Sequence, residues 1–311
     1  MGKESTGLKS SMQLARLRPN TVLQIVTAIL FATIAIVATR GGMVYVTDSH
    51  SYIYAAQTHA AGLDMMTDPD LSGNTYTPLT LWPGGYPWAI AHGLRPGLSP
   101  DATTRLINIA AYVLVAISMA HLTRSLPAWS RAAALIALAL CPGLLLLLPM
   151  VLSELLFLAL LVPSLVFMQT NTRRGLVVAG CLLGLAGIVR YAGIPFIGAS
   201  IWLVWLHNRK RGAYGRVNIY LFTILSSAPL VAWMFRNAGL TGKALGPHTV
   251  GNSNLTPAQV FSDFALVNLK WVMMIGVIYA TCYGIDRVYH RLQSVRSRVG
   301  HDERAQSIGK P

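Results

Sequence analysis

Long apolar runs constrain the fold of this chain more than any other feature of the sequence, because several of them approach the length needed to cross a lipid bilayer. Residues 21–39 and 132–150 are two such runs, and a membrane-spanning helix needs about 20 predominantly apolar residues. Hydrophobic residues make up 53% of the chain and charged residues only 12%. Since lipid offers backbone polar groups no partner, spans of this kind fold as helices. The sequence therefore predicts an all-α polytopic membrane protein.

Eight apolar segments are candidate spans, which gives a bundle of about eight transmembrane helices. They are residues 21–39, 107–122, 132–149, 151–169, 176–189, 192–206, 217–235 and 269–285. The first follows a basic leader, residues 1–20, and is longer than the roughly 7–15-residue apolar core of a signal peptide. No clear small-residue cleavage site follows it, so we expect an uncleaved anchor.

The apolar stretch 175–207 is too long for one span and short for two. Arg173 and Arg174 precede it, and a second basic group, 209–211, follows it. Because basic loops stay on the cytoplasmic side, both ends lie inside and the stretch must turn back on itself. We expect this turn near residues 190–193.

The same rule orients the whole chain, with both termini on the cytoplasmic side of the membrane. Most of the 25 Lys and Arg residues then lie on the inner side. The expected parts are the leader 1–20, a transmembrane domain 21–285 with outer loops 40–101 and 237–268, and a basic tail 286–311. The net charge of +14 thus reflects orientation and attraction to anionic membrane lipids, and no nucleic-acid partner is expected.

This topology places four ionisable residues at the outer ends of different helices: Asp48, Glu154, Arg190 and Arg236. Charged groups at membrane depth are costly and mark polar cavities, so we expect a shared site that faces outward. Two arginines near two carboxylates suit an anionic, phosphate-bearing ligand. Two plainer explanations remain. Glu154 could simply stabilise the helix dipole at the start of its helix, and both arginines could extend to lipid headgroups.

The outer loop 40–101 contains helix and turn signals of its own and is expected to carry interfacial helices. Asp48 is a good N-cap and Gly62 a good C-cap for a helix on the membrane surface. One face of that helix would carry Tyr52, Ala55, Ala56 and His59. The later stretch 81–88 holds two prolines, two glycines and three aromatic residues, which predicts a turn at the interface. Simple membrane anchoring would also explain Trp82 and Trp88.

No cofactor is expected, and no metal site. The loop histidines His50, His59 and His92 match no compact zinc pattern. The three cysteines are far apart in apolar runs, which gives neither a disulfide nor a zinc site. A divalent cation has only the unsupported motif Asp68-Pro69-Asp70 in its favour.

The order of the motifs resembles a bacterial GT-C glycosyltransferase of the family 39 type, related to the protein O-mannosyltransferases and the lipid A aminoarabinose transferases. The resemblance covers roughly residues 40–265. The motifs are Asp48-Ser-His-Ser-Tyr52, Trp82-Pro-Gly-Gly-Tyr-Pro87, Ser153-Glu154, Gly184-Leu-Ala-Gly-Ile-Val-Arg-Tyr191 and Trp233-Met-Phe-Arg-Asn-Ala-Gly239.

The resemblance implies transfer of a sugar from a polyprenyl-phosphate donor to a lipid, glycan or protein acceptor at the outer, periplasmic face of a bacterial plasma (inner) membrane. Asp48 matches the carboxylate that acts as general base, Glu154 matches the acidic residue of the family's Ser-Glu motif, and we assign both to catalysis. Arg190 and Arg236 correspond to arginines that hold the lipid-linked phosphate. We assign substrate binding also to His50, Tyr52, Trp82 and Tyr86. A single displacement of this kind inverts the anomeric carbon.

Two departures from the family pattern keep other functions open. Pro83 is followed by Gly84 where the family has a second proline, and family members are commonly longer, so we expect a short or truncated member. The alternatives are a non-catalytic GT-C-like scaffold and a lipid or solute transporter.

Overall fold

The computed structural model describes residues 19–67 and 77–246. Within these residues every regular element is a helix, which confirms the all-α class. The helices are α1 (Pro19–Ala38), α2 (Thr47–Ala60), α3 (Gly85–Leu94), α4 (Pro100–Leu122), α5 (Ala128–Ala139), α6 (Pro142–Leu147), α7 (Glu154–Gln169), α8 (Arg173–Val189), α9 (Gly193–Asn208) and α10 (Gly212–Thr241). The expected span 269–285, the tail 286–311 and most of the leader and of loop 237–268 lie outside the described residues.

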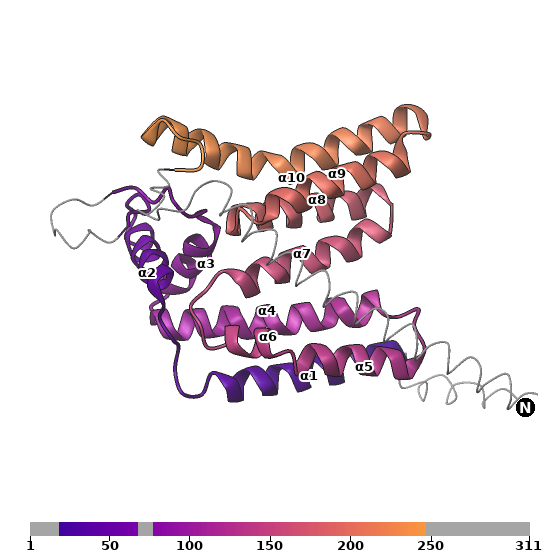
Figure 1. Cartoon of the computed structure of the whole chain (residues 1–311), viewed down its shortest axis with the longest axis horizontal. Helices are drawn as coiled ribbons and strands as arrows, with labels where there is room; N and C mark the ends of the chain where they lie inside the picture. The colour runs from indigo at the N-terminus through magenta and orange to yellow at the C-terminus, as the bar shows by residue number, and fades with distance from the viewer. Residues whose placement is uncertain (1–18, 68–76, 247–311) are drawn as a thin grey trace, which may run out of the picture. The chain divides into compact units, whose positions relative to one another are not determined.

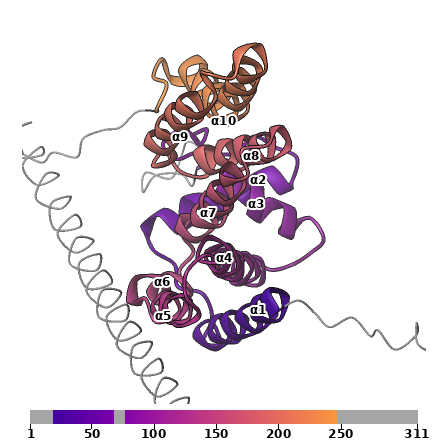
Figure 2. The ribbon, with the colours of Figure 1, turned by 90° about the vertical axis from the view of Figure 1, so that its right-hand side faces the viewer.

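The long helices of this part form a row in which each packs against the next. The order is α1, α4, α7, α8 and α10, with α9 against both α8 and α10 (Figures 1 and 2). The short helices α2 and α3 pack against each other at one end of the row, where α3 also contacts α4 and α8. That end is where α1 and α8 finish and where α4 and α7 begin.

Three of these helices are long and apolar enough to cross a membrane, which supports the membrane class predicted from the sequence. They are α1 over Thr21–Ala38, α4 and α10. The others are shorter: α7 has 16 residues and α8 has 17. At 1.5 Å per residue these rise roughly 24–26 Å, somewhat less than the roughly 30 Å hydrocarbon core.

One expected helix differs in the structure. Residues 132–149 were predicted as a single span, but the helix ends at Ala139 and α6 begins at Pro142. Proline disfavours helical backbone in the residue before it and suits the first position of a helix. Cys141 accordingly has extended backbone, with φ −62° and ψ 112°. Pro142 therefore starts a second helix.

The predicted break near Arg190 is confirmed. Helix α8 ends at Val189, Arg190 has extended backbone, and α9 begins at Gly193. The Gly193 amide donates to the Arg190 carbonyl at 2.9 Å, which closes the turn. The chain thus reverses direction at this point and leaves the Arg190 side chain at the end of the row that carries α2 and α3.

The predicted helix in the outer loop is present as α2, although its N-cap is different. The N-cap is Val46, and Asp48 lies in the first turn. Gly62, with φ +83°, follows the last turn, and the Gly62 and Leu63 amides donate to the His59 and Thr58 carbonyls. This is the hydrogen-bond pattern of a Schellman motif, in which glycine tolerates the left-handed conformation. The second half of the predicted turn 81–88 belongs to α3, which begins at Gly85.

Helices α8 and α10 approach most closely at Gly184. A Cβ atom placed on Gly184 would lie 2.4 Å from the Leu225 carbonyl oxygen and about 3.1 Å from the Pro229 ring. Pro229 has no N–H, so it cannot supply the helical hydrogen bond to that carbonyl. Close contact through small residues is how membrane helices compensate for the weak hydrophobic drive between them. Gly184 is therefore a packing residue.

We expect Gly184→Ala to destabilise the protein by about 1–3 kcal/mol, the usual cost of overpacking against atoms that cannot move aside. The matched control is Gly198→Ala in α9, where an added Cβ meets nothing within 4 Å. That change should be neutral or stabilising by up to about 1 kcal/mol, because alanine favours helix over glycine. Thermal unfolding of the two purified variants in detergent checks this. Equal midpoints would contradict the packing role.

Candidate functional site

The segment that carries Ser153 and Glu154 is held in place from two sides. Asn108, buried in α4, donates from its side-chain amide to the Leu148 and Met150 carbonyls, both at 2.9 Å. On the other side, Val44 pairs with this segment like a short parallel strand: its amide donates to Pro149 at 2.7 Å and its carbonyl accepts from Val151 at 3.0 Å. The start of α7 is therefore fixed by residues far away in the sequence.

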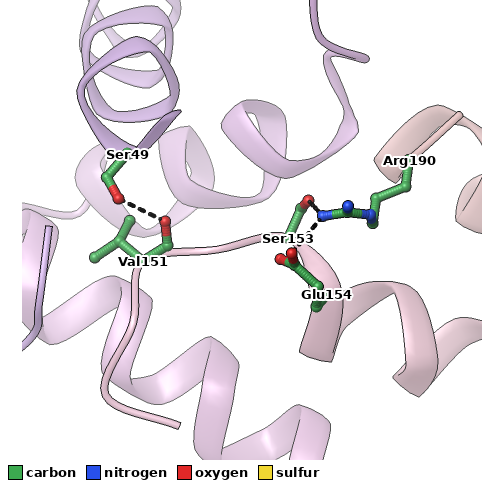
Figure 3. Close-up of polar contacts among 5 residues, drawn as sticks. All are labelled: Ser49, Val151, Ser153, Glu154 and Arg190. Carbon is green, nitrogen blue, oxygen red and sulfur yellow. Dashed lines mark hydrogen bonds and ion pairs between the residues drawn. The ribbon is translucent and has the colours of Figure 1, made fainter. Parts of the chain in front are cut away.

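Ser49 attaches the start of α2 to the same segment. Its buried hydroxyl donates to the Val151 carbonyl at 2.9 Å (Figure 3). The same hydroxyl accepts from the Val46 amide at 2.9 Å. Asp48 is the neighbouring residue and is half-buried. The first turn of α2, with its candidate general base, is thus anchored two residues from Ser153.

Arg190 reaches the same place from the end of α8. Its Nη1 atom donates to the Ser153 hydroxyl at 3.0 Å and lies 2.8 Å from Glu154 Oε1 (Figure 3). The two charged side chains are 32% and 30% exposed. Both contacts use Nη1, and a guanidinium has five N–H donors. Within the described residues, Nη2 and Nε are therefore left for a ligand.

Three aromatic side chains form one wall beside these charges. Tyr52 and Tyr86 are buried and meet edge to face, with ring centroids 5.2 Å apart. The Trp82 ring lies 6.2 Å from that of Tyr52 and is partly exposed. Tyr52 is one helical turn after Asp48, so the two share a face of α2.

The pKa of Tyr52 depends on burial and on the charged groups around it. Burial raises the pKa of its hydroxyl, and its contact with the Ser153 hydroxyl opposes that shift. The negative charges of Asp48 and Glu154 raise the pKa further, whereas the positive charge of Arg190 lowers it. Three of the four charged residues that the sequence assigned to the site, all except Arg236, therefore affect the pKa of this phenol.

Two buried polar atoms in this cluster have no hydrogen-bond partner in the described part of the chain: Glu154 Oε2 and the Tyr86 hydroxyl. Burial raises the pKa of Tyr86 well above its ordinary value, and the charge on Glu154 contributes. The Tyr86 hydroxyl thus remains a neutral donor. Buried polar groups are normally paired, so these two atoms are exceptions within the described residues.

Arg236 belongs to a second group of contacts. Its Nη1 atom donates to the Leu79 carbonyl at 2.9 Å and to the Asn237 side chain at 3.2 Å, and its guanidinium lies over the Trp233 ring. The end of α10 therefore holds the loop that leads to Trp82. The contacts of Arg236 do not include Glu154.

Tyr191 links the two groups, and the sequence analysis did not assign it a role. Its hydroxyl accepts from Trp233 Nε1 and from Asn237 Nδ2, each at 3.2 Å, and Tyr191 directly follows Arg190. Asn237 also donates to the Thr80 carbonyl at 3.0 Å. The only sequence signal was the presence of these residues inside the motifs that contain the two arginines.

His50 stands apart from the cluster. Its side chain is exposed, and its ring centroid lies 6.1 Å from that of Tyr45. Because residues two apart on a helix do not share a face, His50 and Tyr52 point in different directions. The described contacts give His50 no part in the Glu154–Arg190 group.

The described residues contain no group of three His, Cys, Asp or Glu side chains arranged for a metal ion. The Asp68-Pro69-Asp70 motif lies outside the described residues. Comparisons with protein-family models, with curated proteins and with solved structures give no significant match.

The arrangement combines a carboxylate, an ion-paired guanidinium with free donors, and a wall of tyrosine and tryptophan. A guanidinium is suited to a phosphate, an aromatic wall to a sugar ring, and a carboxylate to removing a proton from a hydroxyl. These are the requirements of group transfer from a phosphate ester.

Proposed function

We propose that this protein transfers a sugar from a polyprenyl-phosphate donor to an acceptor hydroxyl at the outer face of a bacterial plasma membrane. The observation that carries the proposal is the contact of Arg190 with Glu154 and Ser153, on a segment to which Ser49 also attaches the first turn of α2, the turn that carries Asp48. The ordered motifs that resemble GT-C glycosyltransferases of the family 39 type support the same function.

The proposed topology has eight spans and both termini in the cytoplasm. Helices α1, α8 and α10 end, and α4, α7 and α9 begin, on the side that carries α2 and α3. The basic residues Arg124, Arg173, Arg174 and Arg209 lie at the opposite helix ends. This alternation agrees with an outward site and a basic inner side.

The proposed reaction is one displacement. Asp48 takes the proton of the acceptor hydroxyl, the acceptor oxygen bonds to the anomeric carbon, and the bond from that carbon to the phosphate oxygen breaks. The released polyprenyl phosphate keeps the bonding electrons, and the free N–H groups of Arg190 stabilise its charge. Attack opposite the leaving group inverts the anomeric carbon.

The other residues are proposed to position these groups. Glu154 and Ser153 orient the Arg190 guanidinium through Nη1. Trp82, which is partly exposed, contacts the sugar, and the buried rings of Tyr52 and Tyr86 support it from behind. Arg236 holds the Trp82 loop through Leu79 and offers its remaining donors to the phosphate.

The test is a transfer assay with the purified protein in proteoliposomes that contain a synthetic polyprenyl-phosphate sugar labelled in the sugar. The label should leave the carrier only when an outer-face acceptor is present, and the product should have the inverted anomeric configuration. Movement of the intact labelled lipid across the bilayer would instead identify a transporter. Unchanged cellular function and complex assembly with both Asp48 and Glu154 neutralised would identify a scaffold.

A further inference from the structure

An open groove lies at the end of the helix row opposite the candidate site. It has a volume of about 720 Å³, within the roughly 300–1,000 Å³ of small-molecule pockets. Its apolar wall comes from four helices, through Leu122 of α4, Leu165 of α7, Leu176 of α8 and Leu203 of α9. Helices α4, α7 and α9 begin on the side of the candidate site and end at this groove.

The rim of the groove is polar. Gln169 and Asn171 lie where α7 ends, and His207 lies in the last turn of α9. The Nδ1 atom of His207 contacts the Leu203 carbonyl at 3.2 Å, so Nε2 is the ring nitrogen available to a ligand. An apolar wall beneath a polar rim matches the two parts of an amphipathic molecule.

The surroundings of the rim are basic. Arg124, Arg173, Arg174 and Arg209 are exposed, and each lies within three residues of a residue that lines the groove. The acidic residues of the described part do not offset them. Asp48, Asp64, Asp101 and Glu154 all belong to α2, the loop after it, or the first turns of α4 and α7, at the other end of the row.

Two tryptophans on α9 indicate the level of the membrane surface beside the groove. Trp202 and Trp205 stack with ring centroids 4.9 Å apart, and the Arg209 guanidinium lies 4.9 Å from the Trp205 ring centroid. Trp202 is 58% exposed although it is large and apolar. Tryptophan gathers where lipid tails meet headgroups. The rim therefore lies at headgroup depth, with the apolar wall beside the lipid tails.

We propose that this groove binds an anionic phospholipid. One acyl chain occupies the apolar wall between α4, α7, α8 and α9. The headgroup phosphate lies at the rim, where Arg173, Arg174 and Arg209 pair with it. Basic pockets between membrane helices on the cytoplasmic side recognise anionic headgroups in this way. This site is separate from the sugar-transfer site and does not depend on the proposed reaction.

The test is native mass spectrometry of the full-length protein in a non-ionic detergent, with phosphatidylglycerol or phosphatidylcholine of the same chain length added. One phosphatidylglycerol should be retained in preference to phosphatidylcholine. Arg173→Gln with Arg174→Gln should weaken its binding about 30-fold, the effect of two basic residues beside an anionic headgroup. The charge-matched control, Arg40→Gln with Arg95→Gln, alters exposed arginines at the other end of the row and should not weaken phosphatidylglycerol binding.

A second pair of variants tests the apolar wall. Leu203→Trp places a larger side chain in the groove and should abolish lipid retention. Leu206→Trp, on the same helix, alters a residue that does not line the groove and should have no effect. Leu203 and Leu206 are 47% and 37% exposed, so both variants should fold. Equal retention of the two lipids, or wild-type retention by both the Arg173/Arg174 and Leu203 variants, would overturn the proposal.

Discussion

Replacing Asp48 with asparagine is expected to lower sugar transfer by about 10²–10⁴-fold, the range that a positioned general base contributes. In free energy this is about 3–5.5 kcal/mol of the barrier. The structural cost is much smaller, because Asp48 is a first-turn residue whose charge stabilises a helix end by only about 0.3–1 kcal/mol. The rate of sugar release, measured beside the unfolding midpoint, therefore separates the two effects.

The matched control for this variant is Asp101→Asn. Asp101 is another carboxylate at a helix start, and it accepts a hydrogen bond from the Tyr45 hydroxyl. An asparagine oxygen can accept the same bond, so transfer should stay at the wild-type rate. Wild-type turnover by the Asp48 variant would refute its assignment as the base.

The positions of the basic residues predicted the reversal of the chain at Arg190. The break at Arg190 followed from basic residues at both ends of one apolar stretch, and the structure has it between Val189 and Gly193. The break before Pro142 was missed because the run 132–149 is uniformly apolar. The local signal was present, since a proline marks a helix start more often than a helix interior.

The candidate site was predictable in its residue types but not in its contacts. The topology placed Arg190 and Glu154 on one side, but their ion pair depends on how α7 and α8 pack. The partner of Arg236, the Leu79 carbonyl, is 157 positions away in the sequence and carries no side-chain signature. A backbone carbonyl is present in every residue, so a sequence pattern does not identify it as an acceptor. The contacts of Arg236 could therefore be identified only in the structure.

Arg190→Lys is expected to lower kcat/KM for the polyprenyl-phosphate donor by about 10²–10³-fold, the loss that follows removal of one preorganised donor to a developing anion. Lysine keeps the charge but has three N–H donors in place of five, so holding Glu154 and Ser153 would leave one donor for a phosphate where arginine leaves three. Lysine keeps a positive charge beside Glu154, so the loss of stability should be small compared with this loss of activity. Steady-state kinetics with varied donor measure the change.

The control and the partner variant separate phosphate binding from helix packing. Arg105→Lys alters an arginine at the same end of the row, which donates to Thr39 and to the Ile36 carbonyl. This variant should leave donor KM unchanged.

Glu154→Gln should weaken transfer less than Arg190→Lys does. The double variant should be no worse than Arg190→Lys alone, because Glu154 acts by orienting Arg190. Strictly additive losses would mean that Glu154 contacts the substrate independently. A wild-type donor KM and kcat in Arg190→Lys would show that the guanidinium does not bind the phosphate.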